Sequence, residues 1–191
     1  MTKNRLEAFS DAVIAILITI MILELKVPHG VDVGALRPML PTFLAYVLSF
    51  VVLAIYWNNH HHMLHATRHV TGGVLWANVH LLFWLSLIPF TTAWMGENEF
   101  APLPTALYGA VLFFAGVAYL ILQTTIIAND GMAPEVAAAL RGDVKGKISA
   151  FLYAAAVPLA FVHRGIAGAI YAAVALMWLV PDRRIEKALR H

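Results

Sequence analysis

The sequence contains no cysteine and few charged side chains. Asp, Glu, Lys and Arg make up only 13% of its 191 residues, about half of their share in ordinary soluble domains. Without cysteine, disulfides, thiolate metal sites and cysteine nucleophiles are excluded. Extended basic blocks are missing as well, because no run of basic residues exceeds Arg183-Arg184 and the formal net charge is +2. We therefore expect no nucleic-acid partner.

Catalytic motifs are absent too. The chain has no His-Glu-x-x-His, no Gly-x-Ser-x-Gly and no phosphate-binding loop, and these motifs carry metalloprotease, hydrolase and nucleotide chemistry. No nucleophile, base and orienting residue occur at a usable spacing. The sequence therefore predicts a protein that is not an enzyme and has no cofactor.

Apolar residues are abundant instead. They make up 61% of the chain, with a mean hydropathy of +0.75, which is more than the interior of a soluble domain of this length can hide. We therefore predict an all-α polytopic membrane protein, with one transmembrane domain over 1–191. Charged residues separate six apolar stretches, which predict six transmembrane helices at about 8–25, 40–63, 72–94, 104–127, 147–163 and 165–181. The last two are short enough that a re-entrant hairpin is the alternative to two full spans.

Basic residues are distributed unequally between the two sides of the membrane. If the N-terminus is cytoplasmic, ten of the 13 Lys and Arg residues lie inside, and only Lys26, Arg37 and Arg164 lie outside. Cytoplasmic loops normally carry the excess of Lys and Arg. We therefore expect both termini to be cytoplasmic.

The first predicted helix carries an apolar stripe and one acidic residue turned away from it. At 100° per residue, Ile16, Thr19 with Ile20, and Leu23 share one face of the helix. Asp11 lies five residues before Ile16, which places it about 140° from that stripe. If the stripe lines a pore, Asp11 points back into the protein and needs a partner there.

Polar residues near the cytoplasmic ends of the second and third predicted helices can supply such a partner. The candidates are Trp57, Asn58, Asn59, His60, His61, His62, His65, Asn78 and His80. One interpretation is a structural polar network with Asp11. The alternative is a metal site, because His61 and His65 are spaced i, i+4 like zinc ligands on a helix. It predicts a metal or proton-coupled transporter.

Two motifs resemble a known family. Arg5-x-x-x-Phe9-Ser10-Asp11 opens the first predicted helix, and Trp57-x-x-His60-His61 lies late in the second. Together with six spans, they resemble the prokaryotic members of the transmembrane protein 175 family of potassium channels. The resemblance in span number and order covers nearly the whole chain. It implies a cation channel in a prokaryotic inner membrane, with potassium and other monovalent cations as the permeant ions.

The resemblance also implies roles for individual residues. In that family four first helices surround the pore, so a chain with one six-helix repeat implies a homotetramer. The bulky residue five positions after the motif aspartate forms a hydrophobic constriction, which corresponds to Ile16. Ile20 and Leu23 match further bulky positions, and Thr19 matches a threonine associated with a polar layer. Arg5 and Asp11 resemble the residues that tie the first helix to its neighbours, and the remaining motif and network residues are Phe9, Ser10, Trp57, His60, His61 and Asn78.

Selectivity has to come from an unusual source, because the sequence lacks the Thr-Val-Gly-Tyr-Gly filter of ordinary potassium channels. A ring of isoleucines offers no ligands, so an ion passes with a compressed or partly shed water shell. Potassium holds its water less tightly than sodium, and we therefore expect a modest preference for potassium. Such a ring can also gate by drying out. A non-conducting membrane scaffold is a further alternative that the sequence leaves open.

Overall fold

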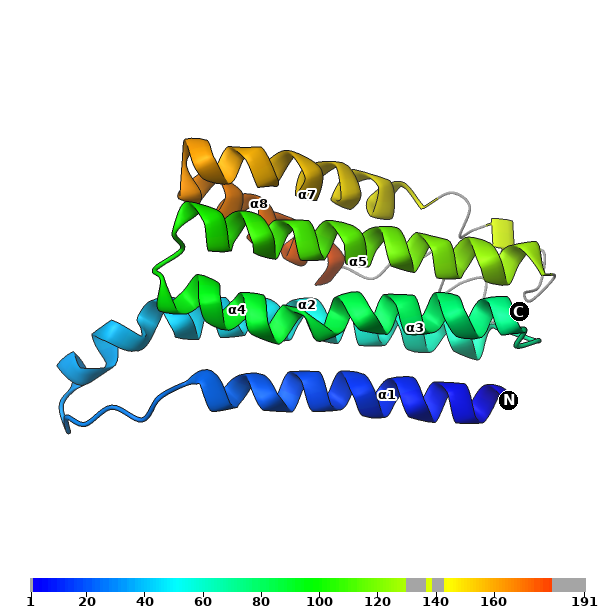
Figure 1. The fold of residues 1–191 in the computed structure, drawn as a ribbon, viewed down its shortest axis with the longest axis horizontal. Helices are drawn as coiled ribbons and strands as arrows, with labels where there is room; N and C mark the ends of the chain where they lie inside the picture. Colours follow the sequence, from blue (N-terminus) through cyan, green and yellow to red (C-terminus); the bar gives the residue numbers. More distant parts are fainter. Residues whose placement is uncertain (1, 130–136, 139–142, 180–191) are drawn as a thin grey trace.

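The chain folds into a bundle of roughly parallel and antiparallel helices. The structure, a computed structural model, describes residues 2–129, 137–138 and 143–179. No strand occurs among these residues, and long helices dominate (Figure 1). The predicted all-α membrane fold is confirmed.

The helices follow the order of the predicted spans. Their bounds are α1 Lys3–Ile20, which continues as the 3₁₀ helix η1 Met21–Glu24, then η2 Val33–Met39, α2 Leu40–His65, α3 Gly72–Ser86, α4 Ile88–Glu97, α5 Pro102–Ala128, α7 Val144–Val162 and α8 Arg164–Leu179. Within the described residues, five stretches are long and apolar enough to cross a membrane. The sixth, α8, has 16 residues, and positions 180–181 of the expected sixth span lie outside the described residues.

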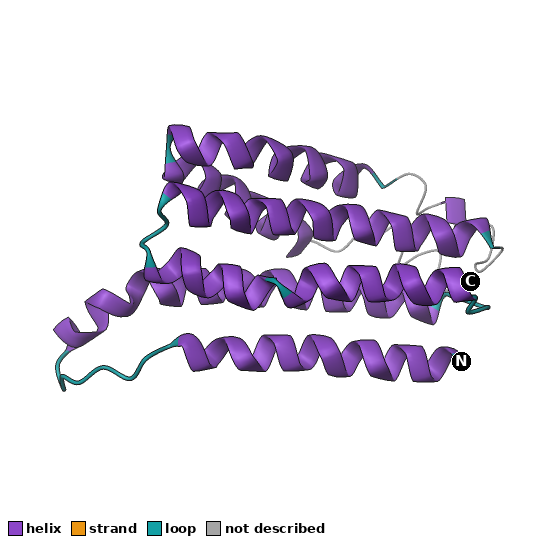
Figure 2. Ribbon diagram, viewed as in Figure 1, coloured by secondary structure: helices purple, strands orange, loops and turns teal. Residues whose placement is uncertain are grey.

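The stretch expected as one helix over 72–94 forms two. It is interrupted at Leu87, between α3 and α4, and Figure 2 shows this short break within the long rod. Pro89 lies at the start of α4. Proline has no backbone N–H to donate, and its ring crowds the preceding turn, so the first turn of a new helix accommodates it better than a helix interior does. The two helices still continue as one span of 26 residues.

The bounds of α1 also differ from the expected 8–25. The α-helix begins at Lys3, and after Ile20 it tightens into η1. The sequence interpretation treated charged residues as boundaries of the span. In the structure Lys3, Arg5 and Glu7 lie within the helix, and Lys3 and Glu7 have partners on α2.

Small residues set the closest helix contacts within the bundle. Helix α1 packs against α2 and α3, while α5 packs against α3, α4, α7 and α8. At Gly96 of α4, a Cβ atom would stand 2.7 Å from the Cα of Thr42 on α2. At Gly109 of α5, it would stand 2.1 Å from the hydroxyl of Tyr171 on α8. Glycine is therefore required at both contacts, as is usual where membrane helices approach closely.

Polar contacts close the end of the bundle where α4 meets α5. Lys26 forms an exposed ion pair with Glu97, with Nζ 2.8 Å from Oε1. This bond and the charge of Glu97 raise the pKa of Lys26 above its ordinary value. The turn between the helices places Glu99 and Phe100 at φ of 48° and 59°, and Arg164 donates to the Glu99 carbonyl at 2.7 Å. The bond from Arg164 holds this left-handed turn against the start of α8.

Candidate functional site

Helix α1 has one buried face and one exposed face. Leu6, Ser10, Ile14 and Leu17 are buried at spacings of three and four residues, which places them on a single side of the helix. This side packs against α2 and α3. The four side chains therefore form the contact between α1 and the rest of the bundle.

The opposite face of α1 is apolar and largely exposed. Its large side chains are Phe9, Ile16, Ile20 and Leu23, which are exposed by 50%, 57%, 40% and 78%. Thr19 is exposed among them, and its hydroxyl donates to the carbonyl of Ile16 at 2.9 Å. The structure therefore brings the candidate constriction residues and the candidate polar layer together on one exposed stripe.

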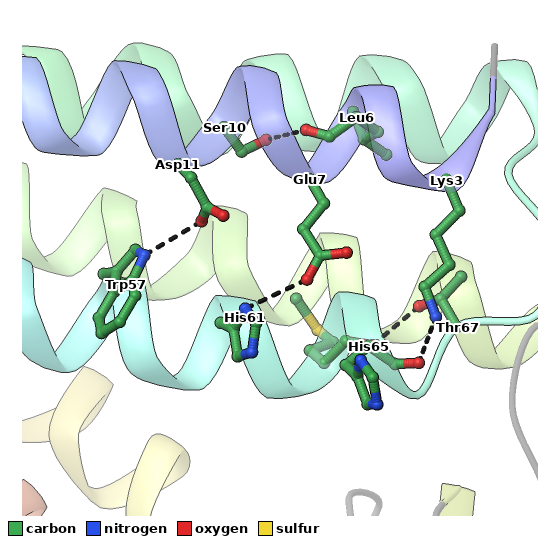
Figure 3. A network of polar contacts seen from close by, with 10 residues as sticks. Lys3, Leu6, Glu7, Ser10, Asp11, Trp57, His61, His65 and Thr67 are labelled. Carbon is green, nitrogen blue, oxygen red and sulfur yellow. Dashed lines mark hydrogen bonds and ion pairs between the residues drawn. The ribbon is translucent and has the colours of Figure 1, made fainter.

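Three polar contacts fix α1 along α2 (Figure 3). From the helix start inward, they join the ammonium of Lys3 with the carbonyl of His65, the carboxylate of Glu7 with His61, and the carboxylate of Asp11 with Trp57. Each step of four residues along α1 is matched by a step of four back along α2. Because residues four apart share a helix face, the contacts form a straight ladder between the antiparallel helices.

The two inner contacts of the ladder differ in kind. The indole Nε1 of Trp57 donates to Oδ1 of Asp11 at 3.1 Å. Oε1 of Glu7 lies 3.1 Å from Nδ1 of His61, but this ring nitrogen has no hydrogen bond of good geometry. The Glu7 contact is therefore an ion pair when His61 is protonated, whereas the Asp11 contact is a directed hydrogen bond.

A second polar network lies buried beside the ladder and joins three helices. Nδ2 of Asn78 on α3 donates to the Ser10 hydroxyl of α1 at 2.9 Å, and Oδ1 of Asn78 lies 2.7 Å from Nε2 of His60 on α2. The Ser10 hydroxyl donates onward to the Leu6 carbonyl at 2.9 Å. Because an amide oxygen only accepts, Nε2 of His60 carries the proton. All three side chains of the network are fully buried.

The second ring nitrogen of His60 ends this network. Nδ1 is buried and has no hydrogen-bond partner in the described part of the chain. With the proton on Nε2, Nδ1 of the neutral ring is an acceptor. The imidazole of His60 is therefore held on one side only, by Asn78.

The histidine rings along the ladder stack on neighbouring rings and do not point toward a common centre. His61 stacks on Trp57 and on His65, with ring centroids 6.0 and 6.1 Å apart. Among the residues that the structure describes, no three His, Asp or Glu side chains are grouped so that they could hold a metal. His61 and His65 share a face of α2, as their spacing predicts. The acidic residue that contacts His61 is Glu7.

Arg5 lies apart from both networks. Its side chain is exposed, and within the described residues it forms no hydrogen bond or ion pair. It shares the exposed side of α1 with Phe9, four residues later. The structure therefore brings Ser10 and Asp11 of the motif to α2 and α3, but it brings neither Arg5 nor Phe9 there.

The sequence interpretation missed Lys3 and Glu7 as members of the ladder. A signal was available, because Lys3, Glu7 and Asp11 repeat at four residues, as do Trp57, His61 and His65. Two such series on antiparallel helices can face each other along their whole length. The match was missed because the charged residues before position 8 were interpreted as lying outside the first membrane span.

Comparison with known proteins adds sequence evidence to this geometry. The profile of the family described as endosomal/lysosomal potassium channel TMEM175 matches residues 5–89. A protein named as a potassium channel from Chryseobacterium sp. strain P1-3 is 50% identical over 190 residues, which are 100% of this chain and 99% of that protein. Another, from Streptomyces collinus, is 30% identical over 92% of this chain and 91% of its own.

A solved structure shows the same fold. It is described as a lysosomal potassium-selective channel TMEM175 homolog from Chamaesiphon minutus, and it superposes with a TM-score of 0.82 at 25% identity. The match covers 93% of this chain and 96% of that one. These relatives are ion channels rather than enzymes, and their similarity extends over nearly the full length of the chain. The chain therefore belongs to the TMEM175 family of potassium channels and is a multi-pass membrane protein.

Proposed function

We propose that four copies of this chain assemble into a cation channel whose pore is lined by the exposed face of α1. The observation that carries the proposal is the division of α1 into a buried side and an exposed apolar side. Ile16 and Leu23 are more than half exposed, although the same helix buries Ile14 and Leu17 against the bundle. A second set of bulky side chains at helical spacing, facing away from the bundle, fits a helix that meets its own copies around an axis.

Ile16 forms the constriction in this proposal, followed by Ile20 and Leu23. A ring of aliphatic side chains gives an ion no ligands, so the ion must keep most of its water or shed part of it at a cost. Sodium binds its water more tightly than potassium and pays more at such a ring. The channel accordingly prefers potassium modestly, and drying of the ring closes it.

Thr19 supplies a polar layer between these rings. Its hydroxyl proton is directed to the carbonyl of Ile16. The oxygen lone pairs that remain are free to accept from water or to face a cation. Thr19 therefore offers a partial negative charge between two apolar turns of the same stripe.

Polar side chains of α1, α2 and α3 hold α1 in the orientation that this pore needs: Ser10, Asp11, Trp57, His60, His61 and Asn78. The ladder fixes one edge of the helix to α2, and the buried network fixes the next edge to α3. Arg5 and Phe9 lie outside both sets of contacts and on the exposed side. We assign them to the contact between neighbouring copies of the chain.

We infer the orientation of the protein in its membrane from the distribution of Lys and Arg residues. We place the N-terminus and the ladder at the cytoplasmic side of a prokaryotic inner membrane, since ten of the 13 Lys and Arg residues then lie inside. No observation favours the transporter alternative at His61 and His65, because the described residues offer no third metal ligand.

The decisive experiment compares potassium and sodium flux from liposomes that hold the purified tetramer. Wild type is expected to pass potassium faster than sodium, and Ile16→Asn to lose this preference, because an amide ring can solvate either ion. Ile121→Asn is the matched control, since Ile121 is an isoleucine exposed by 41% on α5. The control is expected to keep wild-type selectivity. Unchanged selectivity in Ile16→Asn, or equal loss in the control, contradicts the assignment of the constriction.

A further inference from the structure

The exposed half of α1 divides lengthwise into a row of bulky side chains and a row of small ones. Phe9 and Ile20 are exposed by 50% and 40%, and the other members are exposed or partly exposed. The bulky row is Phe9, Val13 and Ile20, and the small row is Ala8, Ala12 and Ala15. At 100° per residue, the bulky row lies about 20–60° to one side of Ile16 and the small row about 40–100° to the other. The two rows therefore flank the candidate constriction residue.

This division has a consequence for a ring of four helices. In such a ring each α1 has two neighbouring copies, whose directions lie about 45° to either side of the direction of the axis. With Ile16 directed toward the axis, the bulky row faces one neighbour and the small row faces the other. Cyclic symmetry makes the contact heterologous. The bulky row of each copy therefore meets the small row of the next.

The two rows also match along the length of the helix. Rotation about an axis along the membrane normal leaves depth unchanged, so residues with the same number lie at the same depth in every copy. Phe9 of one copy then lies about 1.5 Å in depth from Ala8 of the next, and Val13 is equally close in depth to Ala12. Small residues let membrane helices approach closely, so the bulky side chains can fill the groove over the small row. A two-fold contact would instead pair each row with itself.

Lipid is the other candidate occupant of this half of α1. Acyl chains adapt to an apolar surface and need no match between large and small side chains, whereas contacts between helices depend on that match. The ladder to α2 and the buried network to α3 fix the rotation of α1 about its own axis. Both rows lie outside these polar contacts. A fixed rotation with two complementary rows favours a second copy of the chain.

We propose that the bulky row of α1 packs on the small row of α1 in the next copy, with Phe9 covering Ala8 near the start of the helix. This contact sets the spacing of the four helices around the pore. The inference rests on the proposed tetramer and identifies the surfaces that meet in it.

Disulfide cross-linking tests the contact, because the chain contains no native cysteine. In Ala8→Cys/Phe9→Cys, oxidation is expected to link each copy to both neighbours, and a denaturing gel then shows covalent trimers and tetramers. A disulfide needs Cβ atoms about 3.5–4.5 Å apart, so each single variant, which pairs like with like across a wider gap, is expected to give about fivefold less product.

Ala150→Cys/Phe151→Cys is the matched control. It changes the same Ala-Phe dipeptide on α7, where Phe151 is exposed by 72%. Helices α1 and α7 lie at opposite edges of the bundle (Figure 1). The control is therefore expected to give no covalent trimers or tetramers.

A second pair of variants tests the contact without cysteine. Ala8→Leu fills the groove, and because overpacking is destabilising, we expect the tetramer fraction in size-exclusion chromatography to fall about twofold or more. Phe9→Ala in the same chain removes the ring that the added leucine meets in the neighbouring copy, and it is expected to restore much of that fraction. Helical content measured by circular dichroism is expected to stay at the wild-type level in both variants.

The inference is overturned by tetramers in which the double cysteine variant gives no covalent trimers, or by equal cross-linking in a single variant or in the α7 control. An Ala8→Leu tetramer fraction equal to wild type overturns it as well. Absence of any tetramer in wild type would instead overturn the proposed function, and this contact with it.

Discussion

The indole of Trp57 donates a hydrogen bond to the carboxylate of Asp11 across the α1–α2 contact, with the two atoms 3.1 Å apart. Hydrogen bonds to charged groups contribute about 1.5–3 kcal/mol. Asp11→Ala removes the acceptor, so we expect the free energy of unfolding to fall by about that amount, which lowers the thermal midpoint. We also expect less of the proposed tetramer in size-exclusion chromatography. Asp11→Asn keeps an acceptor oxygen and is expected to retain most of the stability. A well-assembled Asp11→Ala tetramer with altered permeability alone would contradict this structural role.

Asn78 bonds to both Ser10 and His60. Its removal leaves the buried Nε2–H of His60 without an acceptor, while the Ser10 hydroxyl keeps its bond to the Leu6 carbonyl. Leaving a buried polar group unsatisfied costs about 1–3 kcal/mol. We therefore expect Asn78→Ala to lower thermal stability more than Asn98→Ala, because the amide of Asn98 is exposed and bonds to the Trp94 carbonyl of its own helix. Equal thermal midpoints of the two variants would show that the buried network contributes no net stability.

Gly109 and Gly116 lie two turns apart on α5, and alanine is predicted to have opposite effects at the two positions. At Gly109, the added Cβ clashes with the Tyr171 hydroxyl, and displacing that hydroxyl breaks its bond to the Thr105 carbonyl. At Gly116 the Cβ makes ordinary contact, so alanine is expected to be neutral or to stabilise by about 0.4–1 kcal/mol. Chemical unfolding of both variants in detergent measures the difference.

The double variant Gly109→Ala with Tyr171→Phe tests the origin of that clash. Phenylalanine removes the atom at 2.1 Å, but the ring carbon at 2.9 Å remains. We therefore expect partial rescue of the unfolding free energy relative to Gly109→Ala alone. No rescue would mean that the ring, rather than the hydroxyl, sets the spacing of α5 and α8.

Thr19→Val removes a hydroxyl from the exposed stripe with almost no change in shape. Since the Thr19 hydroxyl bonds within its own helix in the part of the chain that the structure describes, assembly is expected to survive. The ratio of potassium to sodium flux is expected to fall, because potassium sheds its water more readily and therefore loses more direct contact with the Thr19 oxygens than sodium does. A flux ratio identical to wild type would remove Thr19 from the permeation path.

The Lys26–Glu97 ion pair has a defined dependence on pH. The pKa of Lys26 is raised in the folded protein, so the pair's contribution is fully present below the ordinary lysine pKa and is lost as the pH rises through the raised value. Because both side chains are exposed, added salt weakens the pair. Glu97→Gln is expected to lower the pKa of Lys26 in an NMR titration of its ammonium group, and an unchanged titration would contradict this pairing.

Much of the fold was predictable because a bilayer tolerates few charged residues, and the spacing of charges therefore marks the spans. The break at Leu87 was the exception. Pro89 signalled a disturbance, but proline occurs in continuous membrane helices as well as broken ones. Only the packing of α3 and α4 against their neighbours decides between these outcomes.

The candidate site was predictable where helix periodicity alone fixes direction. The spacing of Asp11 from Ile16 placed the carboxylate opposite the stripe, and in the structure it contacts Trp57. Periodicity gives no register between two helices, however, so the pairing of Glu7 with His61 was out of reach. The exposed position of Arg5 was equally hidden, since the family resemblance concerns an assembly and one chain shows only its own contacts.

The ladder between α1 and α2 can form in more than one register, because its contacts repeat every four residues on both helices. If α1 slipped by one helical turn, about 5.4 Å, Asp11 would meet His61 and Glu7 would meet His65, so acidic groups would again face nitrogen-bearing rings. The ladder contacts alone therefore allow several registers of α1 on α2, each one helical turn apart. The buried amide of Asn78 distinguishes these registers, because the same slip replaces its partner Ser10 by the aliphatic side chain of Ile14. A single buried polar residue that selects one register is a known device in paired helices, and Asn78 is the residue that performs it in this bundle.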